Sequence, residues 1–113
     1  MKTSRYFAPG AIALCAVLAV AEVHAADVEV KIDNFTFGPQ QVNVKVGDTV
    51  IWTNRDDIPH TVMSKTMIFR SKVMDTDDKF SFTFTRPGNY PYFCSLHPHM
   101  TGAIVVEAGT AEK

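Results

Sequence analysis

The fold of this chain is read most directly from VNVKVGDTVIWTN, residues 42–54. Residues 42–46 alternate valine with polar side chains, which is the two-residue period of a strand with one buried face. Gly47 and Asp48 are typical turn residues, and residues 49–54 continue as a second segment rich in β-branched side chains. The stretch therefore predicts two strands separated by a turn.

The same two-residue period recurs on both sides of this stretch. It predicts further strands at residues 28–32, 80–84, 90–94 and 103–107. After residue 25, the only stretch without a clear strand pattern is residues 66–78. The sequence predicts no helix of ordinary length. Short strands separated by turns, in a chain of 113 residues, predict an all-β fold: an antiparallel β-sandwich in one domain.

The first 25 residues differ in character from the rest of the chain. Two basic side chains precede an apolar run over residues 11–21, and the triplet 23–25 offers small residues where a signal peptidase reads them. The apolar run is too short to cross a bilayer. We therefore expect residues 1–25 to be a cleaved secretory signal peptide and residues 26–113 to be one mature domain without a membrane span.

Composition and cysteine content exclude several classes of protein. The formal net charge is −1 and no block of basic residues stands out, which excludes a strongly basic nucleic-acid binder. Of the two cysteines, Cys15 lies in the expected signal peptide, so Cys94 has no partner for an internal disulfide. In an oxidising compartment such a thiol is expected to be hidden, reactive or bound to a ligand.

Side chains that can bind a metal gather near the C-terminus. Cys94, His97 and Met100 follow one another at intervals of three residues, and His60 is a fourth candidate upstream. Two histidines and a cysteine with a weak axial methionine are the donor set of electron-transfer copper sites. Zinc is less suited, because methionine binds it poorly and structural zinc sites commonly use further cysteines or histidines.

The segment PGNYPYFCSLHPHM, residues 87–100, resembles the copper loop of the cupredoxins. Within that family it is most similar to the amicyanins, in which two residues also separate cysteine from histidine and histidine from methionine. The stretch VIWTN, residues 50–54, resembles the same family, and the resemblance extends over residues 27–107. It implies a cupredoxin-like Greek-key sandwich that holds one type 1 copper ion, with the ligands His60, Cys94, His97 and Met100.

The resemblance also implies roles for residues around the ligands. Asn54 is expected to tie the His60 side of the site to the backbone beside Cys94. His97 is expected to reach the surface through an apolar ring formed by Leu96, Pro98 and Pro39. His99 departs from the family, where an apolar residue is usual at this position. The resemblance therefore does not extend to the surface that a partner would contact.

Three further methionines raise the alternative of a methionine-rich copper shuttle. Met63, Met67 and Met74 lack a regular spacing, so we expect them to pack in the core. Trp52 is likewise expected in the core and not as a redox relay.

These observations predict a periplasmic type 1 copper protein that carries single electrons between redox partners. By resemblance these partners are methylamine dehydrogenase, as the donor, and a c-type cytochrome, as the acceptor. The alternative is a periplasmic protein that stores or delivers copper, because the same ligands would serve. An enzyme is not expected, since a substrate needs an open metal position and all four ligands are supplied. We expect a monomer that binds no nucleic acid.

Overall fold

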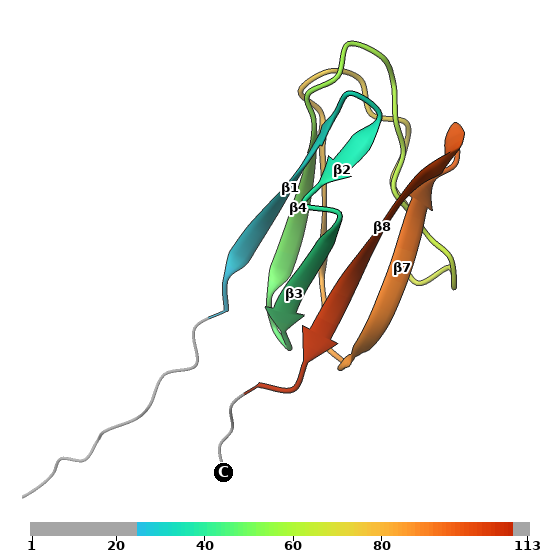
Figure 1. Ribbon diagram of the computed structural model, residues 1–113. Helices are drawn as coiled ribbons and strands as arrows, with labels where there is room; N and C mark the ends of the chain where they lie inside the picture. The colour runs from blue at the N-terminus through green and yellow to red at the C-terminus, as the bar shows by residue number, and fades with distance from the viewer. Residues whose placement is uncertain (1–24, 110–113) are drawn as a thin grey trace, which may run out of the picture.

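The computed structural model describes residues 25–109 (Figure 1). The expected signal peptide, apart from its last residue, lies outside the described residues. Between residues 25 and 109, no helix is long and apolar enough to cross a membrane.

Two four-stranded sheets face each other as a sandwich (Figure 1). The strand order in one sheet is β2-β1-β4-β6, and in the other it is β3-β8-β7-β5. The first sheet contains β1 (Asp27–Asp33), β2 (Thr36–Gly38), β4 (Thr49–Asn54) and β6 (Lys79–Thr83). The second sheet contains β3 (Gln41–Lys45), β5 (Met63–Ser64), β7 (Gly88–Cys94) and β8 (His97–Glu107).

The predicted all-β sandwich is confirmed, but its sheets are mixed and not wholly antiparallel. β1 pairs with β4 in parallel, and β3 pairs with β8 in parallel. The chain leaves the first sheet after β2, forms β3 in the second sheet and returns as β4, so that β4 runs beside β1 in the same direction. Alternation of polar and apolar residues reports which face is buried and does not report strand direction.

The predicted strand positions are close to the observed ones, with two exceptions. β8 begins at His97 and not at Ala103, because the segment expected as a loop continues the pairing with β7 up to Cys94. β2 and β5 were not predicted, since strands of three and two residues are too short for a period to show.

Aromatic side chains fill the space between the sheets. Trp52 is fully buried, as expected, and its ring centroid lies 5.4–5.6 Å from those of Phe69, Phe80 and Tyr92. Packing of this kind fixes the sheets relative to each other, because protein cores are as densely packed as organic crystals. The ends of the strands are therefore held as a rigid frame.

The three methionines expected in the core behave differently. Met74 is buried and Met63 is partly buried, whereas Met67 is 62% exposed and has a positive φ of 64° in the turn after β5. The prediction of core packing is therefore wrong for Met67: a turn tip presents its side chain to solvent whatever its polarity.

Candidate metal centre

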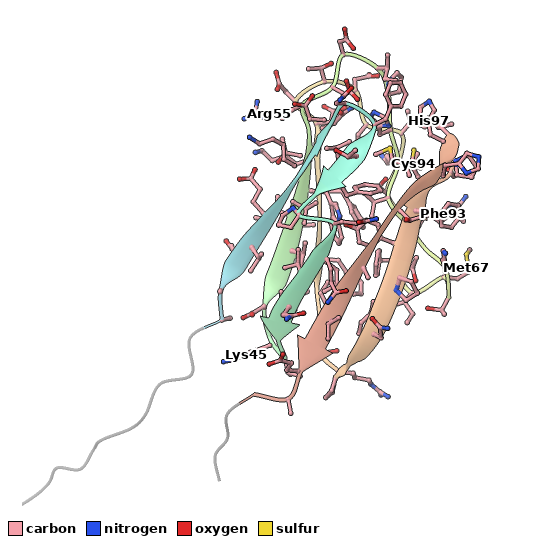
Figure 2. All side chains as sticks on the ribbon, in the orientation of Figure 1. Lys45, Arg55, Met67, Phe93, Cys94 and His97 are labelled. Carbon is pink, nitrogen blue, oxygen red and sulfur yellow. The ribbon has the colours of Figure 1, made fainter. Side chains whose placement is uncertain are left out.

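The predicted ligands meet at one end of the sandwich. Cys94 is the last residue of β7 and His97 is the first residue of β8, while Lys45 marks the opposite end (Figure 2). His60 lies between β4 and β5, where its backbone N–H and C=O pair with the C=O and N–H of Met74 at 3.1 and 2.9 Å. The fold thus brings a third ligand from a distant part of the sequence to the β7–β8 turn.

Three donor atoms lie close enough to share one metal ion. Cys94 Sγ is 3.7 Å from His60 Nδ1 and 3.6 Å from His97 Nδ1, and the ligand atoms of the three residues all lie within 4.8 Å of one another. Ligands bonded to one ion at about 2.0–2.3 Å have such separations. His60 and Cys94 are buried, while His97 is partly exposed. A soft thiolate with two imidazoles fits copper.

Met100 is placed to complete this set, whereas His99 is not part of it. Met100 is 5% exposed and lies in β8 next to Thr101, which pairs with Phe93, the neighbour of Cys94. His99 is exposed and lines a hollow of about 200 Å³ together with Phe35 and Met100. Among the described residues, the cluster of metal-binding donors includes His60, Cys94 and His97 and omits His99.

Asp56 fixes the orientation of the His60 ring. Its carboxylate Oδ2 lies 2.9 Å from His60 Nε2 and also accepts the backbone N–H of Phe35 at 3.1 Å. The hydrogen bonds from His60 and Phe35 hold the pKa of Asp56 below its usual value, so the group is an ionised acceptor. His60 Nε2 therefore carries the proton, and Nδ1 is left free to face Cys94 and a metal.

Thr61 joins the two loops that carry the ligands. Its Oγ1 accepts the backbone N–H of Ser95 at 2.7 Å, and its own backbone N–H donates to Cys94 Sγ at 3.4 Å. An N–H aimed at a thiolate stabilises its negative charge. Thr61 was not predicted, because nothing local marks a threonine that acts on a cysteine 33 positions away.

The bridge expected from Asn54 to the backbone beside Cys94 is absent within residues 25–109, and that prediction is wrong. Asn54 is fully buried and works within its own region: Nδ2 donates to the carbonyls of Ile58 and Met74 at 3.0 and 2.9 Å, and Oδ1 accepts the N–H of Asp56 at 2.9 Å. Asn54 thereby shapes the loop that carries His60, and Thr61 makes the contact toward Cys94.

An aromatic side chain that was not predicted to belong to the site covers both histidines. The ring of Phe35 meets His97 and His60 edge to face, with centroids 5.1 and 5.7 Å apart. Asn34 and Phe35 both have positive φ, 50° and 59°, which is rare for a bulky residue. The N–H of Phe35 is held by Asp56, so the same carboxylate orients the ligand and its cover.

The apolar surface expected around His97 is present in part. Leu96 is 47% exposed and Pro98 is also exposed, and each is a direct neighbour of His97 in the chain. Phe35, which is 50% exposed, contributes the ring that actually contacts His97. The exposed surface at this end of the molecule therefore combines a partly exposed imidazole with apolar side chains.

A β-sandwich with a buried cysteine and two histidines converging at one end defines the type 1 copper class of protein. The Cupredoxin-like domain family matches residues 7–106, and the chain therefore belongs to the cupredoxin family. This is a family of electron-transfer proteins and not of enzymes. The geometry above fits the single copper ion that such proteins hold.

Curated relatives within this family include amicyanins. The chain is 38% identical over 95 residues to amicyanin of Paracoccus versutus, covering 80% of this chain and 72% of the relative. It is 36% identical over 107 residues to amicyanin-alpha of Methylorubrum extorquens, covering 90% of each.

Solved structures that are similar to this chain also include cupredoxins and amicyanins. A purple cupredoxin from Nitrosopumilus maritimus matches with a TM-score of 0.68 and 31% identity, over 71% of this chain and 99% of the other. A mutant of amicyanin with Cu(I) matches with a TM-score of 0.68 and 35% identity, over 71% and 81% of the two chains.

Proposed function

We propose that this protein is a periplasmic carrier of single electrons that binds copper through His60, Cys94, His97 and Met100. One observation carries the proposal: Nδ1 of His97 and Nδ1 of His60 lie 3.6 and 3.7 Å from the sulfur of Cys94. His60 and Cys94 are buried, and His97 is partly exposed. Copper bound there would supply a one-electron Cu(II)/Cu(I) couple. By its similarity to amicyanins, we propose a dehydrogenase as the electron donor and a c-type cytochrome as the acceptor.

The task of the surrounding residues is to keep the ligands in one place while the electron moves. Asp56 holds the ring of His60, and Thr61 holds the loops of His60 and Cys94 together. Copper(II) and copper(I) prefer different surroundings, so a frame that cannot relax toward either of them keeps the reorganisation on electron transfer small. The rigid frame of the sandwich makes these positions costly to change.

The route for the electron to a partner begins at His97. This ligand is partly exposed, and Phe35 and Leu96 give the surface around it an apolar character. A small apolar patch suits a brief encounter, because weak electron-transfer complexes bury less than about 1,200 Å² in total. The protein would then release its partner soon after one electron has passed.

Voltammetry of the copper-loaded protein tests this function against copper storage or delivery. A carrier shows a reversible one-electron wave and keeps its copper through repeated cycles in the presence of a Cu(I) chelator. A delivery protein loses its copper to the chelator on reduction. Copper loss on the first reduction would contradict the electron-transfer proposal and favour delivery.

A further inference from the structure

A second surface lies beside the metal centre, over two neighbours of Cys94, Thr61 and Ser95. A shallow hollow of about 420 Å³ lies against the segment after β5, and we name it the Thr61–Ser95 hollow. It is lined by Thr61, Arg70, Ser71, Lys72, Val73 and Ser95. Among the described residues, this lining contains two cations and three hydroxyl groups and no carboxylate, although the chain as a whole has a net charge of −1.

The two cations of the hollow are available to a partner. Arg70 and Lys72 are exposed, and within residues 25–109 neither of them takes part in an ion pair. Val73 lies beside them and is 56% exposed, which adds an apolar contact. A neighbouring hollow, which residues 70–73 also line, contains Lys79 and Asp78 as well, so its charge is mixed.

The rim of the Thr61–Ser95 hollow is held by hydrogen bonds. The backbone N–H of Ser71 donates to the carbonyl of Val62 at 2.8 Å, and the N–H of Val62 donates to Ser71 Oγ at 2.8 Å. Ser71 is itself 9% exposed. The spacing of Arg70 and Lys72 is therefore set by the fold, and binding there does not first have to order the backbone.

The floor of the hollow is in contact with the copper ligand Cys94. Ser95 and Thr61 share a hydrogen bond of 2.8 Å between their hydroxyls, and Thr61 in turn lies against Cys94 Sγ, with its N–H at 3.4 Å and its Oγ1 at 3.8 Å. Ser95 is thus two hydrogen-bonded contacts from the thiolate, through Thr61. This path does not include His97.

We propose that the Thr61–Ser95 hollow is a second docking surface, for a redox protein that presents carboxylates, with electrons passing between that partner and the copper through Thr61 and Cys94. The proposal rests on the electron-transfer function proposed above. Charge complementarity selects the occupant: Arg70 and Lys72 attract carboxylates, and Arg can bind one with two hydrogen bonds. One electron moves in each encounter, the copper changes between Cu(II) and Cu(I), and the partner's centre changes by the opposite amount.

Binding is tested directly by NMR on the reduced, copper-loaded protein labelled with 15N. The probe is a deca-glutamate peptide, and inorganic phosphate at equal charge is the comparison. We expect saturable shifts of the amides of Thr61, Ser95 and residues 70–73 with the peptide, and their loss in Arg70→Glu/Lys72→Glu. Shifts of the same size with phosphate would show a small-anion site and overturn the proposal, as would the absence of shifts.

Electron transfer is tested with two small oxidants of opposite charge. We expect Arg70→Glu/Lys72→Glu to slow oxidation of the reduced protein by the anion hexacyanoferrate(III) by about tenfold, and to leave oxidation by the cation tris(phenanthroline)cobalt(III) equally fast or faster. The matched control is Lys31→Glu/Lys45→Glu, which makes the same change in net charge on β1 and β3, with Lys45 at the far end of the sandwich (Figure 2).

The outcomes separate this proposal from the proposed function itself. Equal slowing in the control and in the test variant would show an effect of net charge alone, and the docking proposal would be wrong. If the wild type shows a reversible copper couple while neither variant changes either rate, the electron carrier stands and the second surface does not. If voltammetry of the wild type shows no copper couple, both the electron-carrier function and the second docking surface are wrong.

Discussion

The hydroxyl of Thr61 lies 2.7 Å from the backbone nitrogen of Ser95, and so it joins the loop of His60 to the loop of Cys94. These two segments are far apart in the sequence, and each carries part of the metal centre. The relative position of the ligands therefore depends on this hydrogen bond as well as on the strands. The same side chain also lies 3.8 Å from the cysteine sulfur.

Thr61→Val is expected to change the reduction potential of the copper-loaded protein. Valine keeps the shape but leaves the Ser95 N–H without its acceptor, and loss of a buried hydrogen bond costs about 1–3 kcal/mol. If this cost falls on one oxidation state alone, the potential shifts by about 40–130 mV, since a tenfold change corresponds to about 59 mV for one electron. Voltammetry of Thr61→Val and of Thr61→Ser, which keeps the hydroxyl, measures the effect. An identical shift in both variants would show that the hydrogen bond is not its cause.

Asn54→Leu is expected to act on stability more than on potential. It leaves the carbonyl of Ile58 and the N–H of Asp56 without their partner at a fully buried side chain, and it removes one of the two hydrogen bonds to the carbonyl of Met74. We expect a loss of about 2–4 kcal/mol in the free energy of unfolding. Chemical denaturation of the metal-free protein measures it. A stability within about 0.5 kcal/mol of wild type would contradict the role assigned to Asn54.

Phe35→Ala is expected to make the copper easier to remove. The ring forms a T-shaped pair with each imidazole, and each such pair contributes about 0.5–1.5 kcal/mol beyond its area. We expect copper transfer to an excess of a Cu(I) chelator to be faster by about 2–12-fold for each edge-to-face pair that the substitution removes. Phe35→Leu, which keeps most of the apolar cover, should fall between alanine and wild type. Equal rates in all three proteins would show that Phe35 does not shield the site.

Tyr92 is expected to make folding sensitive to alkaline pH. Its hydroxyl is buried without a hydrogen-bond partner among the described residues, and burial raises its pKa from 10.0 to about 12. Above pH 10 the unfolded chain ionises at this group before the folded protein does. Stability from this group is therefore complete below pH 10 and is lost between pH 10 and 12, by about 2–3 kcal/mol.

Denaturation at a series of pH values checks this prediction, with Tyr92→Phe as the control. Phenylalanine keeps the ring and removes the ionisable group, so the fall between pH 10 and 12 should shrink in the variant. Within residues 25–109 the hydroxyl has no partner to lose, and Tyr92→Phe should therefore be close to wild type in stability at neutral pH. The same alkaline fall in both proteins would place its origin elsewhere.

The sequence predicts the class of fold and the principal donors of the site because both depend on patterns among residues that are close together in the sequence. The alternation in VNVKV, residues 42–46, reports a strand with one buried face, and the intervals between Cys94, His97 and Met100 report a loop that can surround one ion. The parallel pairing of β1 with β4 produces no local sequence pattern, since it depends on where the chain passes from one sheet to the other.

The supporting residues of the site were harder to predict for a related reason. Asp56 and Thr61 act on His60 and Cys94 through single hydrogen bonds, and neither belongs to a motif that marks a metal site. Phe35 contacts the histidines from a backbone in which Asn34 and Phe35 both have a positive φ. This conformation cannot be predicted from a phenylalanine in the sequence. Residue type indicates the donors, whereas three-dimensional contact reveals the residues that hold them.

The visible absorption spectrum of the purified mature protein loaded with copper(II) tests the central claim most directly. Cys94 Sγ within reach of two imidazole nitrogens predicts an intense thiolate-to-copper(II) charge-transfer band, and thus a blue to blue-green protein. Cys94→Ser should lose the band and still fold, because the core depends on the strands and not on the metal. A colourless copper(II) form of the wild type, or a band that survives in Cys94→Ser, would contradict the assignment of a type 1 copper centre.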